Sequence, residues 1–397
     1  MKRGTGNDES GEPTGAWECC RIVAVEESEN ALVMVPDTLD RIPGNAQYVF
    51  TTRLPPGNGS RTLKILWPGD TGEALPGFDY PGNASFAHVL PQILFRSADA
   101  RRWEPLTGGR AIPGGVEIAI NDSASWIAVG IPYFESRYRE LVAFAHSAPG
   151  WQVTRIGRSR EGRPVHAFFR RPTKASTSCG LFILQGYQHY SEWASLHALD
   201  TLVRQLGGIA GADAFAWAIL PCLNQDALAR GWRGDPMHSG NPDELPNGGN
   251  MNRDWDTFSR PETRAAAACY RSLAADHTPR HALDIHMGWS TPDRSGGGLT
   301  VFKDGQLPPG EAARERAFTE TFFRHVPIEP FPWEHSEIDR PNFAAWAVRE
   351  LGCLGQTVEI SRFRSFKSNG QPGPISQDYY EALGPAMARA LIHQYST

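Results

Sequence analysis

The chain has 397 residues, 40% of them hydrophobic, and a formal net charge of −5. The length exceeds what one hydrophobic core usually serves, and the hydrophobic content suffices for packed cores, so we expect two globular domains. The acidic balance argues against a broad basic surface for nucleic acid. The lack of any run of about 18 apolar residues argues against a membrane span.

The first segment, residues 1–16, has two basic residues but no apolar run after them. We therefore expect a short flexible tail and not a secretion signal. Six cysteines are sparse for this length and show no paired spacing, which favours reduced thiols in a cytoplasmic protein over a disulfide framework. They are Cys19, Cys20, Cys179, Cys222, Cys269 and Cys353.

Residues 17–135 carry short runs rich in β-branched and aromatic residues, separated by clusters of Gly, Pro and Asn. No convincing amphipathic helix interrupts them. This pattern predicts an N-terminal domain built as an antiparallel β-sandwich. The expected strands lie within 20–25, 31–35, 47–54, 62–67, 116–120 and 126–131.

From residue 136 to residue 397 the pattern changes, because apolar strands now alternate with helices. Such alternation predicts an α/β domain with a mixed, mainly parallel sheet flanked by helices. A Gly- and Asn-rich stretch, 224–250, predicts a long loop, and long ordered loops are often functional. We expect helices at 137–146, 194–206, 261–275 and 379–394, and strands at 153–159, 165–171, 179–186, 215–224, 281–287 and 354–361.

Three residues with metal-ligand chemistry lie where predicted strands end. His189 and Glu192 are three residues apart between a strand and a helix, and His286 ends a later strand. Zinc prefers such nitrogen and oxygen ligands, and a catalytic site leaves one position open for water. Each signal has an ordinary alternative, because surface helices contain His-x-x-Glu by chance and a lone histidine usually belongs to the core.

A charged residue, Glu359, interrupts another apolar strand pattern. A carboxylate there is costly unless it is paired or used, and beside an activated water it can act as general base. The alternative is a glutamate facing solvent. Arg230, Arg233 and Arg253 can supply positive charge for an oxyanion or a substrate carboxylate, although most arginines simply lie on the surface.

In their order along the chain, these segments resemble the zinc carboxypeptidases of the carboxypeptidase A type, over about residues 138–397. The resemblance implies one Zn²⁺ per chain, held by His189, Glu192 and His286, with Glu359 as catalytic glutamate. Two further segments, one around Arg233 and one around Asn252 and Arg253, resemble family motifs. The resemblance implies that Arg233 stabilises the oxyanion and that Asn252 and Arg253 bind the substrate's terminal carboxylate.

Two departures from the family pattern stand out. One extra residue lies between Gly186 and His189, and no tyrosine occurs between Tyr270 and Tyr379, where the family has a mobile one. The second departure leaves the substrate class open. A β domain before the catalytic domain resembles the cytosolic carboxypeptidase subgroup, which includes deglutamylases.

The favoured function is therefore a metallocarboxypeptidase that acts on the C-terminus of a peptide or protein. One alternative is an amidase or deacylase of a small acylated amino acid, which the same zinc site would serve. Another is a non-catalytic binding protein on this scaffold, although such a protein has no need of Glu359. Four cations are candidates for binding an acidic substrate, and the sequence does not rank them: Arg294, Lys303, Arg340 and Arg349.

Overall fold

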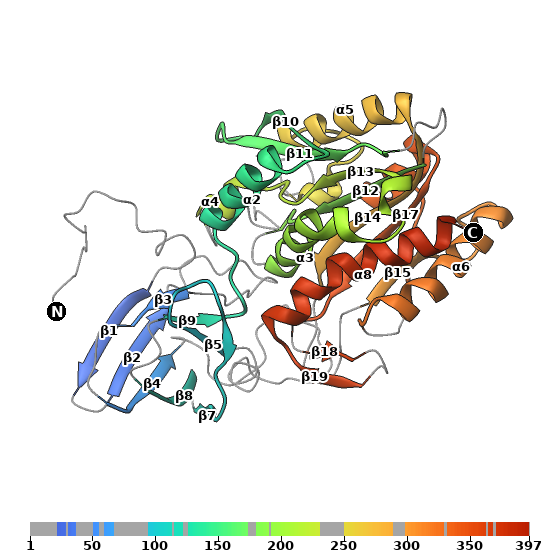
Figure 1. The fold of residues 1–397 in the computed structure, drawn as a ribbon. Coiled ribbons are helices and arrows are strands. Elements are labelled where there is room, and N and C mark those ends of the chain that lie inside the picture. The colour runs from blue at the N-terminus through green and yellow to red at the C-terminus, as the bar shows by residue number, and fades with distance from the viewer. Residues whose placement is uncertain are drawn as a thin grey trace.

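The fold is described from a computed structural model of the chain. The described residues are 22–28, 31–36, 51–54, 59–66, 94–112, 115–121, 126–173, 180–189, 192–230, 250–288, 298–328, 332–362, 364–367 and 371–396. Figure 1 shows a group of N-terminal strands beside a larger body of helices and sheet. The expected tail, residues 1–16, lies outside the described residues.

The N-terminal strands form two sheets, ordered β1-β2-β4-β8-β7 and β3-β9-β5-β6. Alternate side chains of both sheets meet in one apolar core, for example Leu63 and Ile65 from the first sheet with Ile127 and Val129 from the second. This arrangement agrees with the predicted sandwich. The bounds are β1 Ile22–Ser28, β2 Ala31–Pro36, β3 Thr51–Arg53, β4 Arg61–Leu66, β5 Leu94–Ser97, β6 Glu104–Pro105, β7 Arg110–Ile112, β8 Gly115–Ile120 and β9 Trp126–Val129.

The prediction that this domain is wholly antiparallel was wrong at one pairing. Strands β2 and β4 run parallel, whereas every other described pairing within these two sheets is antiparallel. Strand direction depends on the path of the connection, which alternation of side chains does not encode. Strands β5, β6 and β7 were also not predicted.

The second part is built on an eight-stranded sheet ordered β10-β11-β13-β12-β14-β17-β15-β16. Its centre is parallel from β13 to β17, and β10, β11 and β15 bring antiparallel pairings, so the prediction of a mixed, mainly parallel sheet is confirmed. The bounds are β10 Trp151–Arg158, β11 Pro164–Arg170, β12 Gly180–Gly186, β13 Ala216–Leu220, β14 Thr278–Met287, β15 Gly298–Phe302, β16 Pro332–Ser336 and β17 Leu354–Ile360.

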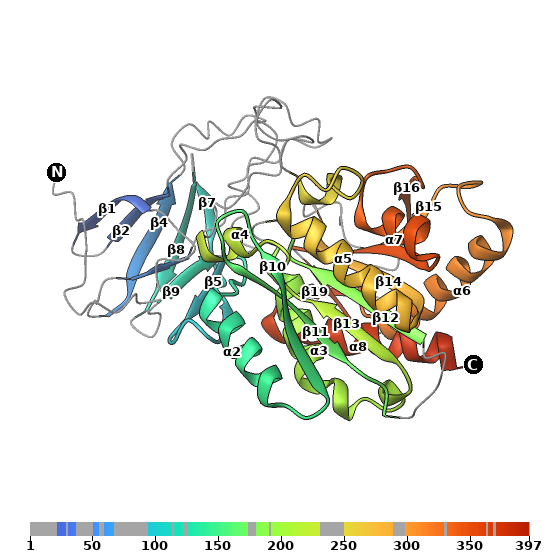
Figure 2. The same ribbon diagram turned by 90° about the horizontal axis from the view of Figure 1, so that it is seen from above.

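Helices cover both faces of this sheet, as Figure 2 shows from above. On β12, Phe182 and Leu184 face the core shared with α2, α3, α6 and α8, while Leu181 and Ile183 face the core shared with α5 and α7. A strand buried on both faces reads as continuously apolar, which is the pattern in the sequence. The helices are α2 Glu135–Ser147, α3 Trp193–Gln205, α4 Gln225–Arg230, α5 Pro261–Asp276, α6 Pro309–His325, α7 Phe343–Leu351 and α8 Gln377–Ser396.

Four elements of the sheet and its helices were not predicted, namely β15, α6, β16 and α7. The stretch 224–250 was expected to be a loop, but α4 occupies its start; residues 231–249 lie outside the described residues. None of the described helices combines the length and the apolar character that crossing a lipid bilayer requires.

The two parts share apolar contacts. Phe95, Trp103, Ile131 and Tyr133 are buried in the core that also contains residues of α2, α3 and α8. The backbone N–H of Trp103 donates to the side chain of Gln377 at the start of α8, at 3.1 Å. The N-terminal sheets are thus packed onto the larger part and not merely tethered to it.

Candidate metal centre

Strands β12, β14 and β17 lie next to one another and run parallel, so their carboxyl ends meet at one edge of the sheet. Gly186 ends β12, where a Cβ would lie 2.9 Å from a methyl group of Leu199 on α3. This close approach of strand and helix explains the glycine. The turn between them carries the first two expected metal ligands.

The turn is held by buried polar groups. Tyr187 has a φ of +45°, which is unusual for a residue with a side chain. Its N–H donates to the Ser195 hydroxyl at 3.1 Å, and its carbonyl accepts from the backbone N–H of Asn224 at 3.0 Å. The Ser195 hydroxyl donates in turn to the carbonyl of Glu192 at 2.7 Å. These contacts fix the backbone on both sides of His189.

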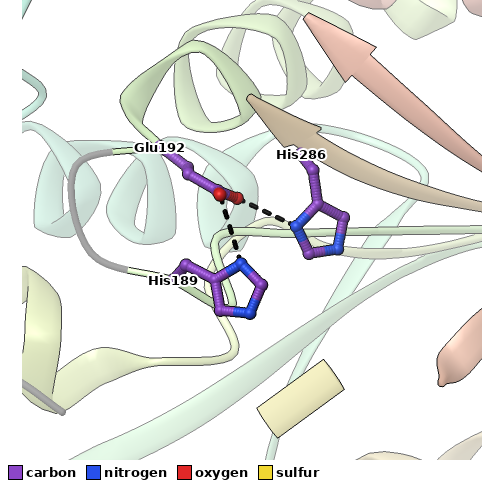
Figure 3. A group of neighbouring side chains, drawn as sticks. All are labelled: His189, Glu192 and His286. Atoms are coloured by element: carbon purple, nitrogen blue, oxygen red, sulfur yellow. Dashed lines mark hydrogen bonds and ion pairs between the residues drawn. The ribbon is translucent and has the colours of Figure 1, made fainter. Parts of the chain in front are cut away.

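Figure 3 shows that His189, Glu192 and His286 converge. Their ligand atoms lie within 4.8 Å of one another, and all three residues are buried. Nδ1 of His189 lies 3.1 Å from one oxygen of Glu192, and Nδ1 of His286 lies 2.9 Å from the other. Two imidazole nitrogens and a carboxylate oxygen are the donor set that zinc takes in catalytic sites. The predicted ligand set is confirmed.

The charges around the ligands also suit a cation. Burial raises the pKa of Glu192, but the two imidazoles outweigh burial and hold that pKa well below the ordinary value. Burial lowers the pKa of His286, but Asp284 and Glu192 outweigh it and raise that pKa. The carboxylate therefore stays ionised at neutral pH.

Glu359 lies on β17 directly opposite His286 in the strand register. Burial raises its pKa to about 7, His286 opposes this, and Glu192 and Asp284 raise it further. A half-buried carboxylate with that pKa can take up and release a proton near neutrality. The structure thus brings Glu359 to the same sheet edge as the metal ligands.

Asn252 and Arg253 belong to a short 3₁₀ turn, η6 (Met251–Arg253). The Asn252 oxygen accepts from the backbone N–H of Phe343 at 3.1 Å, and its nitrogen lies 3.2 Å from Nε2 of His286. Arg253 is half-buried and donates to the carbonyl of Asn252 at 2.7 Å. Asn252 therefore contacts a metal ligand, and Arg253 follows it in the same turn.

Asp254 and Asp256 are the carboxylates nearest to Arg253 in the sequence and could pair with it at the surface. Instead, Asp254 is buried and accepts from Ser259 and Thr263, and Asp256 pairs with Arg349. Within the described residues, no carboxylate forms a salt bridge with Arg253. The surface pair is excluded.

Burial lowers the pKa of Arg253 to about 10; Arg340 adds to this, while Asp284 and Glu359 oppose it. Lys303 is paired with Glu337, and Arg349 with Asp256. Among the candidate cations for an acidic substrate that the structure describes, Arg340 is the one that acts on Arg253 in this way.

Two of the expected cations are not described structurally. Arg233, expected at the oxyanion, and Arg294 lie outside the described residues. The sequence analysis also missed the buried residues that contact the histidines, among them Asn250, whose oxygen lies 3.0 Å from Nε2 of His189.

Residues 138–282 match the family model for zinc carboxypeptidase. No curated protein matches the chain significantly. A metallo-carboxypeptidase from Burkholderia cenocepacia is similar in structure, with a TM-score of 0.70 and 18% identity over 96% of this chain and 97% of that chain. A metallo-carboxypeptidase from Pseudomonas aeruginosa, in complex with (2-guanidinoethylmercapto)succinic acid, has a TM-score of 0.66 and 16% identity over 94% and 95%.

The carboxypeptidase A from Helicoverpa armigera covers less of the chain, 68% of it and 75% of its own length, with a TM-score of 0.50 and 18% identity. At these identities the likeness concerns the fold alone. The two bacterial structures match nearly the whole chain, and so include the N-terminal sheets.

Proposed function

We propose that the chain, whose residues 138–282 match the zinc carboxypeptidase family model, is a member of that family and removes the C-terminal residue of a peptide or protein. The observation that carries the proposal is the meeting of five residues at one sheet edge. These are the ligand set His189, Glu192 and His286, Glu359 opposite His286 in the register, and Arg253 without a carboxylate partner among the described residues.

His189, Glu192 and His286 would hold the zinc, which would supply Lewis-acid chemistry by polarising a carbonyl and lowering the pKa of water. Glu359 accepts the proton of the attacking water on its carboxylate and returns it to the departing amine nitrogen. A pKa near 7 suits both transfers, because the group must be a base first and an acid afterwards. We assign the stabilisation of the developing oxyanion to Arg233, on the family motif.

Arg253 is the group that we propose selects an exopeptidase substrate. A half-buried guanidinium has lost part of its hydration and gains most from an anion with two oxygens. Its charge is not compensated by a salt bridge within the described residues. A peptide's terminal carboxylate supplies that anion, with the amide of Asn252 beside it.

A matched pair of peptides tests this function, one ending in a free carboxylate and the other in an amide. We expect a preference of about a hundredfold or more for the free acid, because a built site rejects a substrate that leaves its polar groups unpaired. Arg253→Ala should abolish the preference, while Arg264→Ala, which removes an exposed arginine that donates to carbonyls after η6, should keep it. Measured kcat/KM on both peptides decides the question.

Equal hydrolysis of the two peptides would instead favour the amidase or deacylase of a small acylated amino acid. Zinc binding without turnover of either would favour a binding protein.

We also propose that the chain belongs with the cytosolic carboxypeptidase type and acts in the cytoplasm. Packing of an N-terminal β part onto the catalytic part supports the first assignment. Free thiols at Cys222, Cys269 and Cys353 support the second. We place the domain boundary near residue 135, where β9 has ended and α2 begins.

A further inference from the structure

Behind His286, on the side away from Glu192, lies a chain of buried polar groups. Nε2 of His286 is 3.0 Å from one carboxylate oxygen of Asp284. The other oxygen of Asp284 accepts from the amide of Gln188 at 2.7 Å, and the oxygen of that amide accepts from the indole N–H of Trp255 at 3.3 Å. Exposure of the four residues is 2% or less, so water does not substitute for these contacts.

Asp284 is placed to accept a hydrogen bond from the Nε2–H of His286. Its oxygen nearest the ring has no hydrogen bond to any other described group. Nδ1 of the same ring faces Glu192 and the metal position. An imidazole that carries its proton on Nε2 presents a lone pair at Nδ1, and a carboxylate at Nε2 stabilises that tautomer and orients the ring.

Gln188 is held with its amide nitrogen toward Asp284 and, at 3.2 Å, toward Nε2 of His286. An indole N–H donates and never accepts, so the Gln188 atom that faces Trp255 is the oxygen, and the amide nitrogen must face Asp284. The backbone carbonyl of Gln188 accepts from the side chain of Asn224 at 2.9 Å. Backbone and side chain are therefore both fixed.

We propose that Gln188 is a positioning residue, which holds the Asp284 carboxylate against Nε2 of His286 and so aims Nδ1 of His286 at the zinc. Gln188 falls in the stretch between Gly186 and His189 that exceeds the family pattern by one residue. The inference rests on the zinc site of the proposed function, but not on turnover of any substrate.

The expected consequence concerns metal binding. Residues behind the ligands typically change metal affinity by about 10- to 100-fold when removed. We expect the Zn²⁺ dissociation constant, measured by competition with a chelator, to rise about 10-fold in Gln188→Leu and up to about 100-fold in Asp284→Asn. The Co²⁺-substituted Gln188→Leu variant should also show an altered ligand-field spectrum, because the His286 ring is free to turn.

A buried glutamine three residues earlier, on β12, provides the matched control. Gln185 is fully buried and accepts from the Tyr270 hydroxyl at 3.1 Å. Gln185→Leu loses a comparable buried hydrogen bond. We expect its Zn²⁺ dissociation constant to stay within about twofold of that of the unaltered protein, and its Co²⁺ spectrum to be unchanged. A merely structural role for Gln188 predicts equal effects in the two variants.

Trp255→Phe decides the matter should Gln188→Leu fold poorly, because it keeps the ring and removes only the N–H. We expect Zn²⁺ affinity to fall in the same direction, by about threefold or more. Unchanged affinity in both Gln188→Leu and Trp255→Phe, or an equal loss in Gln185→Leu, overturns the proposal. Since all readings are taken on the full chain without substrate, they remain decisive even for a protein that cleaves no peptide.

Discussion

At the scale of single residues, one sheet edge holds two carboxylates with opposite tasks. Glu192 lies between two imidazoles, which keep its pKa well below the ordinary range, so it stays charged as a ligand. Glu359 has a pKa near 7, because burial, together with Glu192 and Asp284, outweighs the opposing charges of His286 and Arg362. Environments that push two pKa values apart support the proposed roles of ligand and base.

Glu359→Gln should retain zinc and fold while kcat falls by about 10²–10⁴, the usual contribution of general acid–base catalysis. The amide keeps the size of the side chain but cannot take up a proton. Steady-state kinetics together with metal analysis of the same preparation checks this. A variant with near-normal kcat would remove Glu359 from the mechanism.

Another buried carboxyl, that of Glu315 on α6, makes the free energy of unfolding depend on pH. It is 5% exposed, and burial raises its pKa to about 7, against an opposing hydrogen bond from the backbone N–H of Phe302. The folded chain then holds a proton that the unfolded chain releases above about pH 4.5. Folding stability is therefore lost as the pH rises from about 4.5 to about 7.

Glu315→Gln should raise the free energy of unfolding at pH 8 by about 1–3 kcal/mol, because it removes the cost of a buried charge and still accepts from Phe302. The substitution should also flatten the pH dependence of the free energy of unfolding between about pH 4.5 and 7. Urea unfolding at several pH values measures both effects. Glu320→Gln, on the exposed side of the same helix, is the control and should change neither.

At the scale of elements, the site is assembled by parallel strands that end together. The turn between β12 and α3 supplies His189 and Glu192, and β14 supplies His286. Gln188 and His286, 98 residues apart in the chain, approach to 3.2 Å only because β12 and β14 are neighbours. Metal affinity thus depends on the sheet as much as on the ligands.

His286→Ala should lose most of the roughly one equivalent of zinc expected per chain, because two ligands from a single turn do not complete the site. Metal analysis after dialysis measures the loss. His166→Ala, which removes a half-buried histidine of β11, should keep full zinc content. Full zinc in both His286→Ala and His189→Ala would place the metal elsewhere.

At the scale of the whole molecule, the N-terminal sheets cover apolar surface of the catalytic part. Phe95, Trp103, Ile131 and Tyr133 are buried in the core formed with α2, α3 and α8. The N-terminal part has one histidine, His88, which lies outside the described residues. The sequence of that part shows no cluster of metal-ligating residues. We therefore regard this part as structural.

Deleting residues 1–134 should leave a catalytic part that associates, because the apolar contacts of α2, α3 and α8 become exposed. Size-exclusion chromatography and zinc content of the truncated chain report on this. A monodisperse and fully active truncation would show that the N-terminal part serves another purpose.

The sequence by itself determined the class of the fold, the order of most strands and helices, and the three metal ligands with Glu359. These follow from side-chain periodicity and from spacing to strand ends, which are local properties of the chain. The same local properties left α6 unpredicted, because its apolar residues are mixed with charged ones. They also left β15 and α7 unpredicted, because a short apolar run fits a strand or a helix and only packing selects between them.

Only the tertiary structure decided which groups meet. It excluded a surface pair for Arg253, because Asp254 and Asp256 have other partners. It brought Gln188 and Asp284 behind His286, and it paired β2 with β4 in parallel. Such contacts join residues far apart in the chain, and their energies depend on burial and on all neighbouring charges at once, which spacing along a sequence does not specify.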